Sequence, residues 1–303
     1  MDFKPKFIER YQQLTDWDAF SLCSLSYPRK SIRVNTLKIS VDECRKRLEK
    51  KGWELIPIPW CKEGFWISGH RYDIGNLLEH SLGYIYVQDA SSMIPPLVLC
   101  ATPTDTVLDL CASPGSKSSQ IAMMMGNQGT LVANDVTGDR LAPLGLNLQR
   151  CGVTNTIITQ TPGERIHGLA FDKVLVDAPC SGTGTIAKSW KTITMWNPAM
   201  VKKMSGLQYK LLCTGFENLK SGGTLVYSTC SMEPEEDEGV VSRFVEAHAD
   251  AELQDIDLPL KRSPIILEFE GKSFSLKVKK CLRIWPQDNN TEGFFVAKLR
   301  KAK

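Results

Sequence analysis

Strand-like apolar runs alternate with helical patterns along most of the chain after residue 85. The stretches TVLDLCASPGSKSSQIAMMM (106–125) and TLVANDVTGDRLAPLGLNLQRCG (130–152) each have the pattern of a strand followed by a helix. NTIITQ (155–160) and FDKVLVDAPC (171–180) predict a third and a fourth strand, and LQYKLLCTGFENLKSGGTLVYSTC (207–230) predicts a helix, a Gly-Gly turn and a fifth strand. This alternation predicts an α/β fold with a parallel sheet covered on both faces, and with ligands at the carboxyl ends of its strands.

The two ends of the chain follow different patterns. CLRIWPQDNNTEGFFVAKLRK (281–301) predicts two strands around an Asp-Asn-Asn turn, and therefore an antiparallel edge on the sheet. Before residue 85, FIERYQQL and VDECRKRLEKKG predict helices, while SIRVNTLKIS and GFWISG predict strands. We therefore expect a small α+β domain at 1–85 and the α/β domain at 86–303, with YIYVQDASSM (84–93) at the boundary.

Composition indicates where the protein is located but not which reaction it catalyses. No apolar run approaches the ~18 residues of a transmembrane span, and the segment MDFKPKFIERYQQL lacks the apolar core of a signal peptide. We therefore expect a cytoplasmic, monomeric protein that does not enter membranes. The 10 cysteines are scattered without a CxxC pair and the 4 histidines are isolated, so neither a disulfide framework nor a metal site is expected.

Basic residues are concentrated in two parts of the chain. Residues 29–51 contain nine Lys and Arg against three acidic residues, and residues 261–303 contain eleven against four. Such clusters are usually solvated surface. They also suit a polyanion, because Lys and Arg at phosphates supply most of the sequence-independent affinity for nucleic acid.

The loop after the first α/β strand has the features of a nucleoside-binding turn. VLDLCASPGSKS (107–118) lacks the order of a Walker loop, and a GxGxxG dinucleotide fingerprint is absent as well. What remains is Asp109 at a strand end, a turn of small residues and a helix start, while Asp135 ends the second strand and suits two ribose hydroxyls. S-adenosylmethionine is the commonest nucleoside cofactor without a diphosphate, and Lys117 and the helix amides suit its carboxylate. An ordinary turn whose Asp caps the helix is the open alternative.

Two thiols end two consecutive strands. Cys180 follows Asp177 at the end of the fourth strand, and Cys230 ends the fifth. Neighbouring parallel strands lie about 4.8 Å apart, so both thiols reach one cleft if these strands are adjacent. Such a pair suits cytosine: a thiolate that adds to C6 makes C5 nucleophilic, a carboxyl group assists at N3, and a second group helps release. Lys117 or helix dipoles would favour the thiolate.

Taken together, these motifs resemble the Sun/Fmu family of RNA cytosine-5 methyltransferases. YVQDASSM, DLCASPGSKSSQ, VANDV, VDAPCSGTG, MWNP, SGGTLVYSTCSMEPEEDE and TEGFFVAKLRK occur in the family's order and cover residues 84 to 300, while IRVNTLKIS resembles its small RNA-recognition-like extension. The resemblance implies a Rossmann-like class I methyltransferase sheet, S-adenosylmethionine as cofactor and RNA as partner. It implies Cys230 as nucleophile, Cys180 in product release and Asp177 at N3 or N4 of the base. For the cofactor it implies Cys111, Ala112, Ser113, Pro114, Gly115, Ser116, Lys117, Asp135, Arg140 and Asp177.

The chain departs from the family pattern at a few positions. Ser113 and Ser116 replace the usual Ala and Gly of the loop, and Pro162 stands where an Asp contacts the adenine, with Glu164 two residues later. No RNA-binding domain follows the final strand, which favours transfer RNA over ribosomal RNA. An N-methyltransferase would need an (Asp/Asn)-Pro-Pro-aromatic motif where this chain has Ala178-Pro179-Cys180. A catalytically silent RNA-binding or assembly factor is the remaining alternative, and the intact cysteine pair argues against it.

Overall fold

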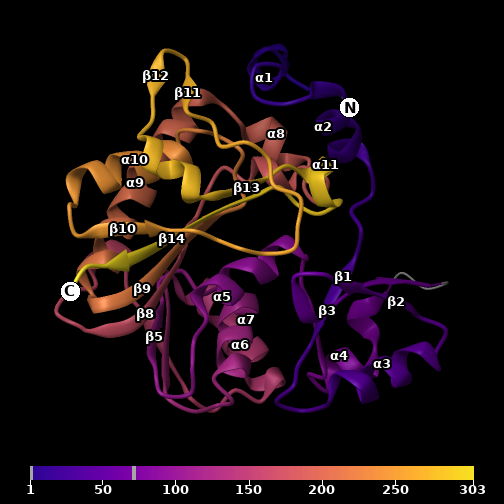
Figure 1. The fold of residues 1–303 in the computed structure, drawn as a ribbon. Helices are drawn as coiled ribbons and strands as arrows, with labels where there is room; N and C mark the ends of the chain where they lie inside the picture. The colour runs from indigo at the N-terminus through magenta and orange to yellow at the C-terminus, as the bar shows by residue number, and fades with distance from the viewer. Residues whose placement is uncertain (1–2, 70–72) are drawn as a thin grey trace.

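A central sheet organises the larger part of the molecule. The computed structural model describes residues 3–69 and 73–303. Its 8-stranded sheet has the order β10-β14-β9-β8-β5-β6-β7, with β13 paired to β14 (Figure 1). The strands are β5 (Thr106–Asp109), β6 (Thr130–Asp135), β7 (Thr156–Gln160), β8 (Phe171–Asp177), β9 (Leu219–Thr229), β10 (Ala251–Gln254), β13 (Leu282–Ile284) and β14 (Phe294–Lys301).

The five strands expected from the sequence pair in parallel, as predicted. Helices α9 (Pro198–Glu217) and α10 (Glu238–Ala247) cover one face, where Val174 and Val176 point. Helices α5 (Ile94–Leu99) and α6 (Ser116–Met124) cover the other face, where Leu175 points. Alternate residues of one strand are thus buried on opposite faces, which explains the continuous apolar run in this strand. Helix α7 (Gly138–Cys151) packs beside α6.

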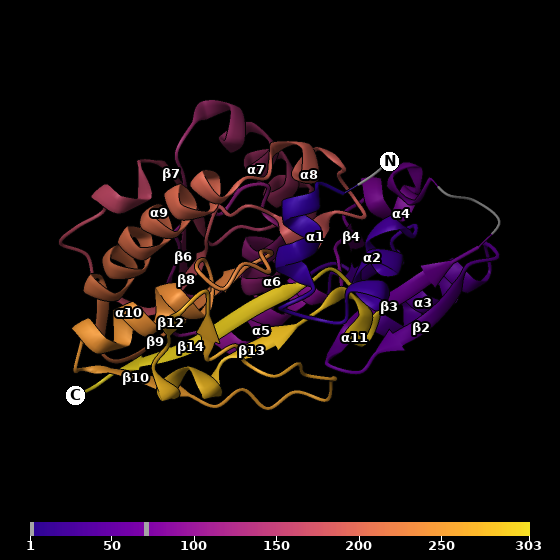
Figure 2. The same ribbon diagram turned by 90° about the horizontal axis from the view of Figure 1, so that it is seen from above.

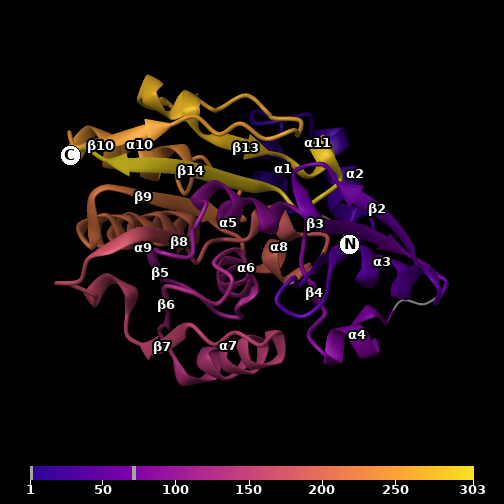
Figure 3. The ribbon, with the colours of Figure 1, turned by 60° about the horizontal axis from the view of Figure 1, so that its bottom comes forward.

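The predicted antiparallel strand near one edge is β14. It lies between β9 and β10 and runs antiparallel to both, while β13 pairs with its first residues. A short helix, α11 (Pro286–Asn289), takes the place of the expected Asp-Asn-Asn turn. The sequence analysis missed β10, because its four residues, AELQ, carry only a weak strand pattern. Figure 3 shows the sheet with β7 and β10 at its two ends; the small hairpin β11 (Glu268–Phe269) and β12 (Lys272–Ser273) lies outside it.

A second, 4-stranded sheet forms the N-terminal α+β unit, in the order β2-β3-β1-β4. Arg33, on its central strand β1, is fully buried and donates to Ser119 Oγ at 2.9 Å and to the carbonyl oxygen of Ser116 at 2.9 Å, both in α6. These bonds fix the small sheet against the start of the helix that follows the cofactor loop. Its elements are β1 (Ser31–Val34), α3 (Val41–Glu49), β2 (Glu54–Ile58), β3 (Cys61–Ser68), α4 (Leu78–Ser81) and β4 (Ile85–Val87).

The first two helices pack away from this small sheet. The helices α1 (Pro5–Tyr11) and α2 (Trp17–Leu25) bury Phe7 and Phe20 against Trp196 and Trp285 of the larger part of the molecule. Figure 2 shows α2 beside α11, with which it is in contact. Large aromatic side chains bury more apolar area than other side chains do, so these contacts determine where the two helices lie. Trp196 follows α8 (Lys191–Met195). The division at residue 85 stays a prediction.

Short 3-10 turns connect several of these elements, namely η1 (Ile74–Asn76), η2 (Ser91–Met93), η3 (Gly163–Arg165), η4 (Thr183–Thr185) and η5 (Leu276–Lys280). Across residues 3–69 and 73–303, no helix combines the length and the apolar character that a membrane crossing requires.

Candidate active site

The two strand-end cysteines meet at the carboxyl edge of the central sheet. Strands β8 and β9 are neighbours, with Asp177 opposite Ser228, so the residues that follow each strand emerge side by side. Cys180 Sγ lies 3.3 Å from Cys230 Sγ, and both are free, half-buried thiols. The expectation that both sulfurs reach one cleft therefore holds in the structure, and their separation is that of a hydrogen bond.

Asp177 lies beside this pair and has two partners. One carboxylate oxygen accepts a hydrogen bond from Lys117 Nζ at 2.6 Å, and the other accepts from Ser228 Oγ at 2.7 Å. Lys117 comes from the first turn of α6, and its ammonium also lies 5.3 Å from the centre of the Phe294 ring. Lys117 is thus bound to Asp177, whereas the sequence had suggested a cofactor carboxylate or a cysteine thiolate as its partner.

The charges around the two sulfurs differ. A hydrogen bond to Cys230, burial and the charge of Glu236 all raise the pKa of Cys180 well above its ordinary value. Burial lowers the pKa of Lys117, but Asp177 and the Cys230 sulfur outweigh it and the net direction is upward. Cys180 therefore ionises less readily than a free thiol, and Lys117 stays protonated beside Asp177.

A second ammonium–carboxylate pair, which the sequence analysis did not identify, lies near Cys230. Lys188 forms an ion pair with Glu292, and the main-chain amide of Glu292 donates to Asp89 Oδ1 at 3.3 Å. Burial and the charge of Asp89 raise the pKa of Glu292 to about 7. Burial lowers the pKa of Lys188, while Glu292, Asp89 and the Cys230 sulfur raise it, and the net direction is upward. Asp89 lies in the motif YVQDASSM and Glu292 in the motif TEGFFVAKLRK. The sequence signal for each was therefore an acidic residue next to a predicted strand.

The loop that carries Cys180 is packed tightly against the loop that carries Cys230. Gly184 donates its N–H to the carbonyl oxygen of Cys230 at 2.9 Å, and Gly293 donates to the carbonyl oxygen of Gly184 at 2.9 Å. A Cβ on Gly184 would lie 2.3 Å from the carbonyl oxygen of Gly293, so only glycine permits this approach. Thr183 Oγ1 accepts from the amide of Met232 at 2.9 Å.

Buried carboxylates reinforce the same two loops. Glu236 Oε2 accepts from the amide of Ser181 at 2.9 Å and from Gln208 Nε2 at 2.7 Å. Burial raises its pKa to about 7. Glu233 is fully buried and accepts from Tyr11, Arg10 and Trp196. The polar run after Cys230 thus fixes the loop of Cys230 through Gln208 of α9 and through Arg10 and Tyr11 of α1.

The predicted cofactor loop forms a turn between β5 and α6. Ser113 and Pro114 are joined by a cis peptide bond, and Gly115 adopts φ +98° at the start of the helix. Asp135 accepts from the amide of Ser113 at 2.9 Å and from Arg140 Nε at 2.6 Å. Ser113 Oγ in turn donates to the carbonyl oxygen of Arg140 at 2.7 Å. The end of β6 and the start of α7 therefore fix the shape of the loop.

Asp109, the last residue of β5, lies beneath this turn. It is buried and accepts from Ser118 Oγ, in the first turn of α6, at 2.7 Å. Burial raises the pKa of Asp109 to about 7. Burial and the charges of Asp109, Asp135 and Asp177 raise the pKa of Cys111 well above its ordinary value, and this residue lines the cavity described next. Asp109 therefore bonds a side chain of the first helical turn and does not cap the helix, whose N-cap is Gly115 without a side-chain cap.

A cavity of about 280 Å³ lies at the point where the strand order reverses beside β5. Such switch points are where open α/β sheets bind ligands. One wall is polar, with Asp135 at the end of β6, and the opposite wall is apolar, with Leu207 and Leu211 of α9. This donor set fits a nucleoside, with the ribose at Asp135 and the base against the leucines. Glu164 lines the cavity, so this acid is available where the sequence analysis noted the loss of the usual Asp at Pro162.

Metal-binding side chains show no comparable clustering. Within the described part of the chain, no group of three or more His, Cys, Asp or Glu side chains is placed to hold a metal ion. The polar groups of the site are instead paired with one another, as described above for Asp177 and Glu292.

Known proteins match this architecture over the whole chain. Residues 96–300 match the model of the 16S rRNA methyltransferase RsmB/F family, and residues 3–90 match that of the N-terminal domain of 16S rRNA methyltransferase RsmF. A tRNA (cytosine(49)-C(5))-methyltransferase of Pyrococcus abyssi is 44% identical, with 100% of each chain covered. A Ribosomal RNA small subunit methyltransferase F of Erwinia tasmaniensis is 41% identical over 99% of this chain, which spans 63% of that enzyme.

Solved structures agree in fold. A methyltransferase homologue from Pyrococcus horikoshii superposes with a TM-score of 0.87 at 39% identity, covering 99% of this chain and 95% of that one. NSun6 from Pyrococcus horikoshii, solved with SFG, has a TM-score of 0.87 at 23% identity, with 99% of each chain covered, and this likeness concerns the fold. With matching family models on both domains, full-length relatives and the predicted sheet in place, the chain belongs to the Sun/Fmu family of RNA cytosine-5 methyltransferases, in its RsmB/F group.

Proposed function

We propose that this enzyme transfers a methyl group from S-adenosylmethionine to C5 of a cytosine in RNA through a covalent bond between Cys230 and C6. The observation that carries the proposal is the convergence of Cys180 Sγ and Cys230 Sγ, 3.3 Å apart, beside the Lys117–Asp177 ion pair. A bound S-adenosylmethionine would supply an electrophilic methyl group on its sulfonium. Asp135 and the loop 111–117 would hold that cofactor, with Glu164 and Leu207 near its base.

Each side chain of the site has its own role in the proposed reaction. Cys230 adds as a thiolate to C6, which places an electron pair at C5. Asp177 accepts a hydrogen bond from the N4 amino group of cytosine, and its ion pair with Lys117 orients that carboxylate. After the methyl group reaches C5, a water molecule takes the C5 proton, and the electron pair of the C5–H bond restores the C5–C6 double bond. The C6–S bond then breaks, and its electron pair returns to the Cys230 sulfur. Cys180 lies within hydrogen-bond distance of that sulfur and assists the release.

The target cytosine has to leave its base stack to reach these groups. An enzyme that acts on a base ring must flip the base out of a duplex or bind it unpaired. We favour transfer RNA as the substrate, because the relative that matches over its full length is a tRNA enzyme from Pyrococcus abyssi. Ribosomal RNA, with a role in ribosome assembly, is the second candidate, since RsmF proteins are relatives of similar identity. Bisulfite sequencing of cellular RNA with and without the gene distinguishes the two.

Two cysteine substitutions test the mechanism. We expect Cys230→Ala to abolish methyl transfer while the affinity for S-adenosylmethionine, measured by calorimetry, stays within about twofold of wild type. We expect Cys180→Ala to accumulate a protein–RNA adduct that migrates slowly on a denaturing gel. Cys213→Ala is the matched control, because Cys213 is also half-buried but lies in α9. Wild-type turnover in both variants would refute the covalent mechanism.

A further inference from the structure

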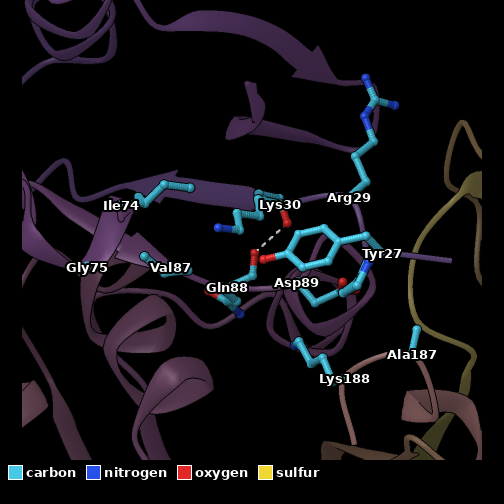
Figure 4. Close-up of a pocket in the computed structure, with 12 residues that line it drawn as sticks. Tyr27, Arg29, Lys30, Ile74, Gly75, Val87, Gln88, Asp89, Ala187 and Lys188 are labelled. Atoms are coloured by element: carbon cyan, nitrogen blue, oxygen red, sulfur yellow. Dashed lines mark hydrogen bonds between the residues drawn. The ribbon is translucent and has the colours of Figure 1, made fainter. Parts of the chain in front are cut away.

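A hollow lies where the N-terminal sheet meets the catalytic domain. The linker between α2 and β1, residues 27–30, borders it on one side, and the end of β4 borders it on another. Ala187 and Lys188, which follow the loop of Cys180, complete the wall (Figure 4). The hollow has a volume of about 360 Å³ and is separate from the cofactor cavity.

Tyr27 is the notable side chain of this hollow. Its exposed fraction of 74% is the highest among the exposed large apolar and aromatic side chains of the described residues. Its ring lies at the opening, with Lys30 Nζ 5.5 Å from the ring centre and Lys188 across the cavity (Figure 4). An exposed aromatic face at the mouth of a cavity stabilises the folded protein little. It is well suited to stack on a flat ligand.

The charge of the wall identifies the class of ligand. Arg29, Lys30 and Lys188 provide three positive charges, against the carboxylates of Asp89 on the wall and of Glu292, the ion-pair partner of Lys188, in an adjoining cavity. Arg29 lies flat over the Trp66 ring, with its guanidinium carbon 4.1 Å from the ring centre, so its position is fixed. Cations interleaved with an exposed aromatic ring form the usual pattern of a site for single-stranded nucleic acid, since the cations meet phosphates and the ring stacks on a base.

The position of the hollow relates it to the nucleophile. Lys188 lines the hollow, and Gly184, four residues earlier, donates its N–H to the carbonyl oxygen of Cys230 at 2.9 Å. Cys230 itself does not line it. Two further cavities, of about 320 and 500 Å³, share Tyr27, Pro28 and Arg29 with the first. The linker thus runs along a continuous hollowed surface that leads away from the reaction centre.

We propose that this hollow binds an unpaired nucleotide next to the target cytosine in the RNA, with its base stacked on Tyr27 and its phosphates near Lys30 and Lys188. The proposal rests on the function proposed above and adds to it a subsite for the RNA strand beside the flipped base. Stacking is tolerant of base identity, so the subsite anchors the strand without reading its sequence.

Substitution of Tyr27 tests the subsite. A stacked base contributes about 1–3 kcal/mol to affinity, so Tyr27→Ala should weaken binding of a fluorescein-labelled oligocytidine roughly 5- to 150-fold in fluorescence anisotropy. Tyr27→Trp keeps a stacking face and should bind like wild type. Leu276→Ala is the matched control, because Leu276 is 68% exposed but lies in η5, outside these cavities. With unmodified tRNA transcripts, Tyr27→Ala should raise KM and leave kcat near the wild-type value.

Photocrosslinking locates the nucleotide directly. A tRNA transcript with 4-thiouridine beside the methylated cytosine should crosslink to the peptide that contains Tyr27, and Lys188→Met should reduce the yield. Wild-type affinity and KM in Tyr27→Ala, or a crosslink only to peptides outside residues 27–30 and 187–188, would overturn the subsite. A wild-type enzyme that methylates no RNA cytosine would instead overturn the proposed function, so the two failures are distinguishable.

Discussion

Arg10 connects the N-terminal helix α1 to the loop that follows Cys230. Its Nε lies 2.8 Å from Glu233, and its other two nitrogens lie 2.5 Å from Glu235 and 2.7 Å from Glu270. Arg10 is 7% exposed and Glu233 is fully buried. Substitution of Arg10 by Met keeps an unbranched apolar side chain but removes the charge. Glu233, three residues after Cys230, then keeps only Tyr11 and Trp196 as partners.

The size of the effect follows from this burial. Removal of one partner from a buried ion pair costs about 3–5 kcal/mol, because the other charge stays buried without compensation. For a protein of this size we expect the melting temperature of Arg10→Met to fall by roughly 6–20 °C. Burial already raises the pKa of Glu233, and Arg10 opposes that rise. Without Arg10 the pKa rises further, so the variant's stability deficit grows as pH increases and shrinks toward pH 5.

Thermal denaturation at pH 5 and pH 8 measures both effects. Arg45→Met is the matched control, because the Arg45–Glu49 pair has exposed fractions of 45% and 42%, and such a pair contributes at most about 1 kcal/mol. Glu233→Gln in the Arg10→Met background removes the uncompensated charge and should recover part of the loss. The reasoning is wrong if Arg10→Met melts like Arg45→Met, or if its deficit is the same at both pH values.

Three further predictions concern the site itself. Lys188→Met removes a positive charge near Cys230 and should slow the alkylation of that thiol by iodoacetamide, as measured by peptide mass spectrometry. Lys188→Arg keeps the charge and should not slow it. Equal alkylation rates in Lys188→Met and wild type would refute the role of Lys188. Gly184→Ala should lose the folded site, seen as a lower melting temperature and no methyl transfer, because its Cβ would lie 2.3 Å from a carbonyl oxygen. The raised pKa of Asp109, about 7, makes its ionisation costly, so stability falls as pH rises from about 4 to 7. Asp109→Asn should flatten that slope in urea unfolding, and an unchanged slope would contradict the assignment.

The sheet and the cysteine pair could be predicted because their signals are local. Each strand is a short apolar run, and parallel strands place their carboxyl ends at one edge, so Cys180 and Cys230 follow from two such runs being neighbours. The antiparallel β14 was predicted from its own apolar pattern. A four-residue strand such as β10 carries no comparable pattern, and it forms because β14 offers it a pairing edge.

Contacts between segments far apart in the chain could not be predicted from the sequence. The bond from Arg10 to Glu233 joins residues 223 positions apart, and no periodicity indicates it. Helices α1 and α2 lie within residues 1–85, and no periodicity indicated that their aromatic residues pack on Trp196 and Trp285. Lys117 had two plausible partners in the sequence, and only the fold shows that Asp177 is within its reach. Glu292 and Lys188 became visible as a pair only when β14 was placed beside the loop of Cys180.

The insertion of β14 between β9 and β10 has a consequence for biosynthesis. Strand β9 leads into Cys230, yet the hydrogen bonds along one of its edges are made by residues 294–301. While the ribosome is still translating the preceding segment, that edge has no partner and is open to pairing with other chains. The nascent polypeptide cannot complete the reaction centre until this late strand has been synthesised. We therefore expect translation arrest before residue 294 to yield aggregation-prone, inactive chains, and a chaperone that masks β9 during synthesis should raise the yield of active enzyme.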